Sequence, residues 1–206
     1  MSGLKENSGN VTFVSIKDGS FVVKQENGQL KAYKSLGGII KRVGFITGTS
    51  QQGRGYEAVK FIIEGGGATY QLDMYTDSRY FLSLCNFLKS SDITREIEIS
   101  PSEKPNEHGK KVQTCFVRQD DKALKASYTR DNMGDLPPLE PVAGATYFDN
   151  TKQVGFWKKW LSETYGVFTP NNPFQNAAAT QGTASTQATA AQEATTLTEP
   201  LDDLPF

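Results

Sequence analysis

Residues 57–75 carry the pattern that most limits what this chain can fold into. In 57–64, large apolar side chains occupy every second position and alternate with Ala58, Lys60 and Ile62. Three glycines follow at 65–67, and in 68–75 a second such set alternates with Gln71, Asp73 and Tyr75. Alternation of this kind is typical of a strand with one face in a core, because successive side chains point to opposite faces. The segment therefore predicts an antiparallel hairpin with one face more apolar than the other. The residues of that face are Val59, Phe61, Ile63, Tyr70, Leu72 and Met74.

Further strand patterns flank this hairpin. Asp-Gly and Asn-Gly pairs near the start of the chain are turn signals, because both favour the positive φ of tight hairpin turns. Gly44 inside a strand pattern indicates a bulge or a bend. The strand patterns outside the hairpin are 11–36 (two or three short strands), 39–47, 95–100, 111–118 and 123–129.

Two segments switch to helical spacing. In residues 77–89, Phe81, Leu84, Cys85 and Leu88 recur at i, i+3, i+4 and i+7, which predicts an amphipathic helix with Asp77 as its N-cap. Residues 150–165 predict a second helix. The apolar stripe of that second helix is Val154, Trp157, Leu161 and Tyr165.

The Trp-Lys-Lys-Trp run at 157–160 has two interpretations. It could be a base-stacking element, but its helical spacing favours packing, with Trp157 against the body and Trp160 at the edge of the stripe.

The order of these elements predicts the fold class. A strand, a long hairpin, a helix and two further strands follow one another, which is the element order of an OB-fold barrel. We therefore expect a mainly β protein built on an OB-fold-like five-stranded barrel with a helix between strands. An N-terminal β extension, a C-terminal helix and a disordered acidic tail complete the expected architecture.

The composition changes after Thr169. Residues 170–196 are dominated by Ala, Thr, Gln, Ser and Gly and hold a single charged residue, Glu193. Such a segment cannot bury enough apolar surface to offset the entropy lost on ordering. We expect an OB-like single-stranded DNA-binding domain at 1–169, a disordered Ala/Thr/Gln linker at 170–196 and an acidic partner-docking tip at 197–206.

The net charge of −1 hides an asymmetry between body and tail. Residues 170–206 contain no Lys or Arg. Subtracting their four acids from the whole leaves 22 basic and 19 acidic side chains in residues 1–169, a net +3 against −4 in the tail. A basic body with an acidic tail is the distribution expected if the tail competes with a polyanion for the body.

The last residues of the tip, DDLPF, combine two acids with a short apolar end. An aromatic ring beside a carboxylate suits an apolar pocket rimmed by basic side chains. DDLPF resembles the tails of bacterial and phage single-stranded DNA-binding proteins, with looser support from Glu199. That resemblance implies an OB domain on unpaired DNA and a tip that docks on replication, recombination or repair proteins. The docking residues it implies are Asp202, Asp203, Leu204, Pro205 and Phe206.

Binding of unpaired DNA needs cations that follow the backbone and aromatic faces for the bases. Arg54, Tyr56 and Lys60 are the central candidates, because a glycine-bordered loop, an aromatic ring and a lysine converge there. Core packing is the competing interpretation for every strand aromatic. The candidate stacking residues are Tyr56, Tyr75, Phe116 and Tyr128. The candidate cations are Lys41, Arg42, Arg54, Lys60, Lys111 and Arg118, with Lys110, Lys122, Lys125 and Arg130 as further members.

Other function classes have weaker signals. Cys85 and Cys115 lie in apolar surroundings and are expected to be reduced core thiols, and His108 is the single histidine. We expect no enzyme, no cofactor and no metal. The alternatives are a β-rich phage scaffold or adaptor that binds no DNA, and a metal-dependent nuclease that uses Asp120–Asp121 or Asp131 and Asp135.

Location and assembly follow from weaker arguments. No apolar run reaches the ~18–20 residues of a membrane span, and the first ten residues are polar. We therefore expect a cytoplasmic protein, in the bacterial host if phage-encoded, with no membrane partner. A homo-oligomer, RNA in place of DNA, and strand annealing all stay open.

Overall fold

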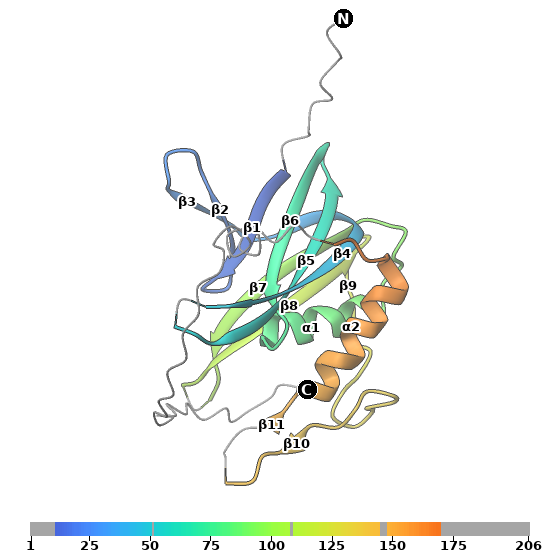
Figure 1. Cartoon of the computed structure of the whole chain (residues 1–206). Coiled ribbons are helices and arrows are strands. Elements are labelled where there is room, and N and C mark those ends of the chain that lie inside the picture. The colour runs from blue at the N-terminus through green and yellow to red at the C-terminus, as the bar shows by residue number, and fades with distance from the viewer. Residues whose placement is uncertain (1–10, 51, 108, 145–147, 170–206) are drawn as a thin grey trace, which may run out of the picture.

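The computed structural model describes residues 11–50, 52–107, 109–144 and 148–169, and strands dominate that part of the chain (Figure 1). The predicted mainly β architecture with a helix between strands is confirmed. The predicted linker at 170–196 and tip at 197–206 lie outside the described residues. The elements are β1 (Val11–Lys17), β2 (Ser20–Lys24), β3 (Leu30–Tyr33), β4 (Leu36–Thr49), β5 (Gly55–Gly65), β6 (Ala68–Tyr75), α1 (Arg79–Leu88), β7 (Ile97–Pro105), β8 (Lys111–Gln119), β9 (Lys122–Ala123), β10 (Glu140–Pro141), β11 (Phe148–Asp149) and α2 (Thr151–Tyr165).

One large mixed sheet runs in the order β3-β2-β1-β6-β5-β4-β7-β8-β9. Neighbours pair antiparallel except β1 and β6, which are parallel. β4, β5 and β6 are consecutive antiparallel neighbours, and the chain returns through α1 to place β7 beside β4. Three sequential strands with a fourth beside the first form a Greek key. Neither helix in the described part of the chain is long and apolar enough to cross a membrane.

A tight turn sets the register of the β5–β6 hairpin. Gly65 pairs with Ala68 across a two-residue turn in which Gly66 and Gly67 have φ of 58° and 77°. Positive φ at both central residues is the geometry that matches the twist of the flanking strands. The predicted 57–75 hairpin is therefore confirmed, with its apolar face turned inward.

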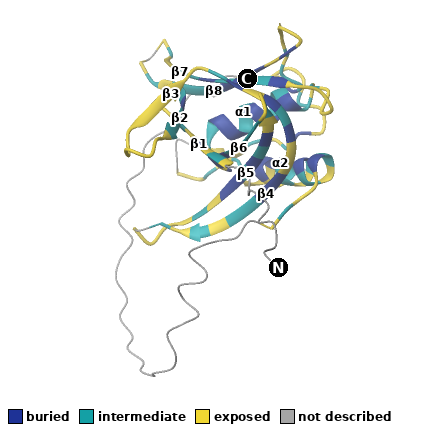
Figure 2. Cartoon of the chain, turned by 90° about the horizontal axis from the view of Figure 1, so that it is seen from above, coloured by how far each residue is buried: buried dark blue, intermediate teal, exposed yellow. Residues whose placement is uncertain are grey.

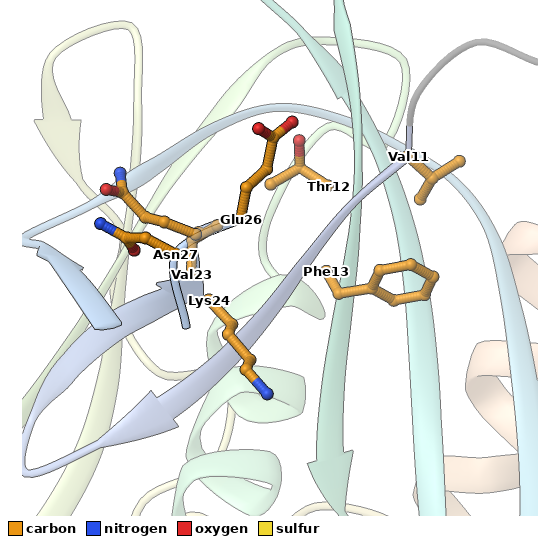
Figure 3. Close-up of a pocket in the computed structure, with 8 residues that line it drawn as sticks. Val11, Thr12, Phe13, Val23, Lys24, Glu26 and Asn27 are labelled. Carbon is orange, nitrogen blue, oxygen red and sulfur yellow. The ribbon is translucent and has the colours of Figure 1, made fainter. Parts of the chain in front are cut away.

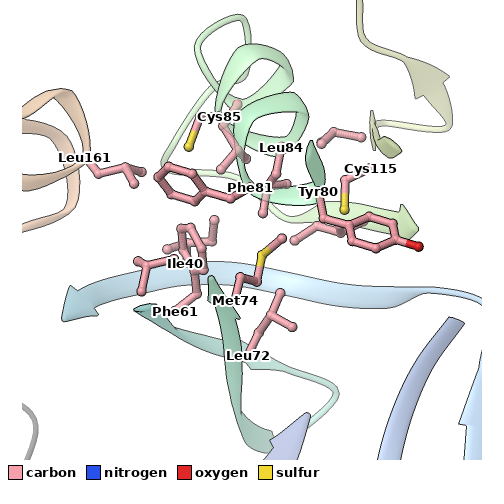
Figure 4. Packing of buried hydrophobic residues seen from close by; sticks show 14 of the residues in the cluster. Ile40, Phe61, Leu72, Met74, Tyr80, Phe81, Leu84, Cys85, Cys115 and Leu161 are labelled. Atoms are coloured by element: carbon pink, nitrogen blue, oxygen red, sulfur yellow. The ribbon is translucent and has the colours of Figure 1, made fainter. Parts of the chain in front are cut away.

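The core lies between the sheet and α1 (Figure 4). Phe81 and Leu84 of α1 are fully buried against Phe61 and Leu72 of the β5–β6 hairpin. Cys85 and Cys115 are free thiols in this core, and burial raises the pKa of both. The inward residues of the sheet and the apolar face of α1 thus form one continuous interior.

The first helix begins one residue later than the sequence suggested. Ser78, not Asp77, is the N-cap, and its hydroxyl accepts a hydrogen bond from the backbone N–H of Phe81 at 3.2 Å. Ser and Asp are comparable caps, so the residue that reaches the third helical N–H decides the start.

The second helix packs through its tryptophan stripe, as predicted. Trp157 is 1% exposed, and the ring of Trp160 lies edge-on to it with centroids 5.8 Å apart. After α2 the chain returns to the sheet, where Val43 donates to the Gly166 carbonyl at 3.2 Å and accepts from Phe168 at 3.0 Å. The packing interpretation of 157–160 is therefore confirmed.

Two strand predictions were wrong in detail. The irregularity in β4 lies between Ile40 and Arg42, not at Gly44. The predicted strand at 123–129 is limited to β9, because Asn86 of α1 captures the following chain. Its side chain accepts from Tyr128 N–H at 2.8 Å and donates to the Tyr128 carbonyl at 2.9 Å, which takes these groups out of strand pairing.

The N-terminal hairpin is anchored to the body at its turn. The Tyr80 hydroxyl accepts from Gly19 N–H at 3.2 Å and donates to Glu103 at 3.3 Å. Burial, followed by the Glu103 charge, raises the pKa of Tyr80 to about 12. The β2–β3 hairpin stands out from the body, and β3 is exposed along its whole length (Figures 1 and 2).

Substitution within α2 tests the packing of this helix. Trp157→Ala should lower the free energy of unfolding by about 3–5 kcal/mol, because it empties a fully buried site. Lys159→Ala on the exposed side of the helix should change it by about 0.5 kcal/mol or less. Urea unfolding followed by circular dichroism measures both. Equal effects of the two substitutions would contradict the packing role.

Candidate nucleic-acid interface

The outer face of the β4–β5–β6 sheet collects several of the predicted binding residues. Val59, Phe61 and Ile63 point into the core, so the alternate residues of β5 point outward. The register then places outward pairs across β5 and β6. These pairs are Ala58–Tyr75, Lys60–Asp73, Ile62–Gln71 and Glu64–Thr69.

Tyr56 and Tyr75 form an aromatic pair at one end of this face. Their ring centroids lie 5.6 Å apart with planes at 85°. Gly48 on β4 makes room for Tyr56, because a Cβ there would lie 2.6 Å from the Tyr56 ring. Tyr75 is 57% exposed. The pair therefore offers a supported ring to solvent, as base stacking requires.

Lys60 lies on the same face but its charge is already compensated. Its Nζ is 2.8 Å from Oδ2 of Asp73, and Gln71 donates to the other Asp73 oxygen at 2.9 Å. The Lys60 side chain is 15% exposed. Lys60 thus orients Asp73 and has little surface left to offer to a phosphate.

Arg54 sits in the loop that leads into β5. Ser50 closes this loop by donating its backbone N–H to the Arg54 carbonyl at 2.7 Å and accepting from Arg54 N–H through its hydroxyl at 3.1 Å. Arg54 is exposed and lies two residues before Tyr56. The loop therefore holds a cation beside the aromatic pair.

Lys41 and Arg42 occupy the bulge of β4. Lys41 lies 3.7 Å from a Glu64 oxygen, with both side chains about half exposed. The Arg42 guanidinium stacks on Phe168 with 5.6 Å to the ring centroid. Arg42 is opposite Ile62 in the register, so it borders the outer face.

Phe13 is a candidate that sequence reasoning missed. β1 pairs with β6 so that Phe13 stands opposite Gln71, while its neighbour Val14 is buried. Phe13 is 65% exposed. Together with Val11, Val23 and Lys24 it lines a cleft of about 940 Å³ between β1 and the β2–β3 hairpin (Figure 3). The alternation within 11–16 could have indicated this ring, but the pairing of β1 with β6 could not be read from the sequence.

Lys111, Phe116 and Arg118 belong to a second group on β8, which β4 and β7 separate from β5 in the sheet order. Lys111 pairs with Glu103 at 2.7 Å, and this contact holds the pKa of that carboxyl below its usual value. The exposed Phe116 ring contacts Phe87, with centroids 5.9 Å apart. Arg118 donates to the Asp121 carbonyl at 3.0 Å.

Tyr128 lies in the core instead of at either group. It is 7% exposed, and its ring centroid is 5.7 Å from that of Trp157. Its hydroxyl donates to Asp135. Burial raises the pKa of Tyr128 to about 12, and the hydrogen bond lowers the pKa of Asp135. Its ring is therefore not presented to a base.

The acidic pairs considered for a nuclease lie in separate contacts. Asp120 pairs with Arg95, and Asp135 accepts from Tyr128. Within the described ranges, no three His, Cys, Asp or Glu side chains gather closely enough to hold a metal ion. The docking residues Asp202, Asp203, Leu204, Pro205 and Phe206 lie outside the described part of the chain.

The structural role of Tyr128 can be tested through its partner. Tyr128→Phe should raise the pKa of the Asp135 carboxyl toward the ordinary value of about 3.9, because the donor is lost. A lowered folded-state pKa stabilises the fold above the unfolded-state value, and this contribution is lost as the pH falls through the folded-state value. The variant should therefore have a lower free energy of unfolding than the wild type at neutral pH, and this difference should shrink in acid. Carbon-detected NMR titration of Asp135 and unfolding at both pH values measure this, and an unchanged Asp135 pKa would contradict it.

No protein-family model, curated protein or solved structure matches this chain.

Proposed function

We propose that this protein binds single-stranded DNA and coats it without strong sequence preference during replication, recombination or repair. The observation that carries the proposal is the outer face of β1, β6, β5 and β4. There, the exposed rings of Phe13 and Tyr75 and the supported ring of Tyr56 lie on one continuous sheet surface. Stacking of a base on such a ring contributes about 1–3 kcal/mol.

The arrangement of the central strands supports an OB-type barrel. β4, β5, β6 and β7 have Greek-key order, β8 follows β7 as a hairpin, and α1 lies between β6 and β7. An OB fold is a five-stranded Greek-key barrel that binds oligonucleotides on its second and third strands and on two adjoining loops. Counted from β4, those strands are β5 and β6. Arg54 lies in the loop between β4 and β5, and Lys110 lies in the loop between β7 and β8.

Cations around this face supply the attraction for phosphates. Arg54 and Arg42 border it on one side. On the side of β1, exposed lysines of β1, β2, β3 and the segment after β3 follow, namely Lys17, Lys24, Lys31 and Lys34. A path for unpaired DNA runs from Arg54 across Tyr75 to Phe13 and on toward these lysines. Binding along such a path weakens as salt rises, because bound counterions are released from the DNA.

The acidic tip has a separate role in this proposal. The DDLPF residues at 202–206 dock on partner proteins while the body holds DNA. Support comes from the likeness of these residues to the tails of single-stranded DNA-binding proteins and from the apolar Leu204 and Phe206, which solubility does not require. The linker allows the tip to reach partners at a distance from the body.

A second candidate is an adaptor that binds protein and no DNA. The favouring observation is that several predicted cations are neutralised by ion pairs, namely Lys41, Lys60 and Lys111. Exposed apolar rings are also typical of protein-binding surfaces. Anisotropy titration with oligo-dT separates the two candidates, because an adaptor shows no salt-sensitive binding.

Aromatic substitutions test the DNA-binding face. Tyr75→Ala and Phe13→Ala should each weaken oligo-dT binding by about 5- to 100-fold, as expected for the loss of one stacked base. Phe148→Ala is the matched control, because this ring on β11 is also about half exposed and lies outside the face. Fluorescence anisotropy on the full chain gives the dissociation constants. If oligo-dT affinity falls only in Phe116→Ala, the DNA-binding site lies at the β8 group, which would contradict this assignment.

The tip is tested by a single substitution. Phe206→Ala should abolish recovery of replication or repair proteins in a pull-down, while oligo-dT affinity stays within about twofold, because the body is unchanged. Thr198→Ala in the same tip serves as the control. Full recovery of partners with the Phe206 variant would show that the ring has no docking role.

A further inference from the structure

We propose that the cleft between β1 and β6 receives one unpaired base that carries an exocyclic amino group, and that Asp73 selects such bases. This inference rests on the proposed function, since it assigns a base preference to one position of the same DNA-binding face.

The cleft forms because β1 and β6 separate. They pair from Val11–Thr69 to Val14–Leu72, and no further pairs follow. Beyond that point a cavity of about 310 Å³ opens onto the face. This is the small end of the range of about 300–1,000 Å³ found for ligand pockets. Core residues such as Met74 and Tyr80 line part of this cavity. From the outer face, its lining includes Ser15, Ile46, Tyr56, Ala58, Asp73 and Tyr75.

The walls of this cleft suit a flat aromatic ring. Ala58 stands between Ile46 and Tyr75 in the cross-strand register, so a small side chain is flanked by two large ones. The edge-to-face Tyr56–Tyr75 pair closes one side. A base stacked on Tyr75 thus has an apolar floor and a rigid aromatic support.

Asp73 is the polar group that decides which base fits. It lies two residues from Tyr75 on the same side of β6, about 7 Å along the strand. Lys60 and Gln71 each donate to one of its oxygens, at 2.8 and 2.9 Å, which fixes the carboxylate in place. Each carboxylate oxygen accepts two hydrogen bonds, so each keeps one acceptor position.

A fixed carboxylate discriminates by hydrogen-bond polarity. Cytosine presents its N4 amino group as a donor, whereas thymine presents the O4 acceptor at the equivalent position. The Asp73 carboxylate accepts a hydrogen bond from the cytosine amino group and repels the thymine O4 oxygen. A phosphate is also disfavoured beside this carboxylate, so the occupant that suits the cleft is a base and not the backbone.

Homopolymer binding tests the inference. The full chain should bind oligo-dC about fivefold more tightly than oligo-dT of equal length, at slightly alkaline pH where cytosine is unprotonated. Asp73→Asn should bring this ratio to about one, because the amide offers a donor to thymine. Fluorescence anisotropy at one salt concentration gives both dissociation constants, and circular dichroism verifies that the variant is folded.

Glu64→Gln is the matched control, because it removes one negative charge from the outer face of β5 at the opposite end of the hairpin. The dC-to-dT ratio should survive that substitution. Three outcomes overturn the inference and leave the proposed function standing. The first is equal wild-type affinity for the two oligomers. The others are a dC-to-dT ratio that persists in Asp73→Asn, or one that falls equally in Glu64→Gln. Failure to bind either oligomer overturns the proposed function and the inference together.

Discussion

Packing of the β5–β6 hairpin against α1 is the interaction on which the rest of the molecule depends. Phe61, Leu72, Phe81 and Leu84 are all fully buried at this contact. Because side chains of a strand alternate, burying one set forces the other set outward. The packing that stabilises the core therefore also brings the outward side chains of β5 and β6 onto one surface. The residues of the candidate site on this surface are Tyr56, Lys60, Asp73 and Tyr75.

The electrostatics of this surface are moderate rather than strongly positive. Lys41 lies in an exposed ion pair and Lys60 in a partly buried one, so the charges of both lysines are compensated. At the margins, within the described residues, exposed positive charge lies at Arg54 before β5 and at Lys17, Lys24 and Lys31 of β1, β2 and β3. In the proposed complex with unpaired DNA, the rings supply most of the short-range interaction with a base. The marginal cations attract the backbone over a Debye length of about 8–10 Å.

Local patterns in the sequence predicted the main strands and helices but not which side chains share a surface. Alternation predicted the 57–75 hairpin, and helical spacing predicted both α1 and α2, because each signal lies within a short window. The sequence makes Tyr128 a candidate stacking residue, but its ring is buried in the core beside Trp157, and Asn86 holds its backbone across 42 residues. The outward position of Phe13 likewise depends on the pairing of β1 with β6, which lie 58 residues apart at Phe13 and Gln71. No local turn fixes such a pairing, so a single sequence does not predict it.

The parallel pairing of β1 with β6 has a consequence for how the protein folds. Phe13 and Gln71 are 58 residues apart and become neighbours only when β1 is added to the edge of the central strands. The contacts of β4, β5, β6 and α1 are far more local, so their loop closure costs less entropy. Loop-closure entropy therefore favours formation of the central strands before β1 docks on β6, so we expect the aromatic surface to be completed late, by a strand that is synthesised before its partner.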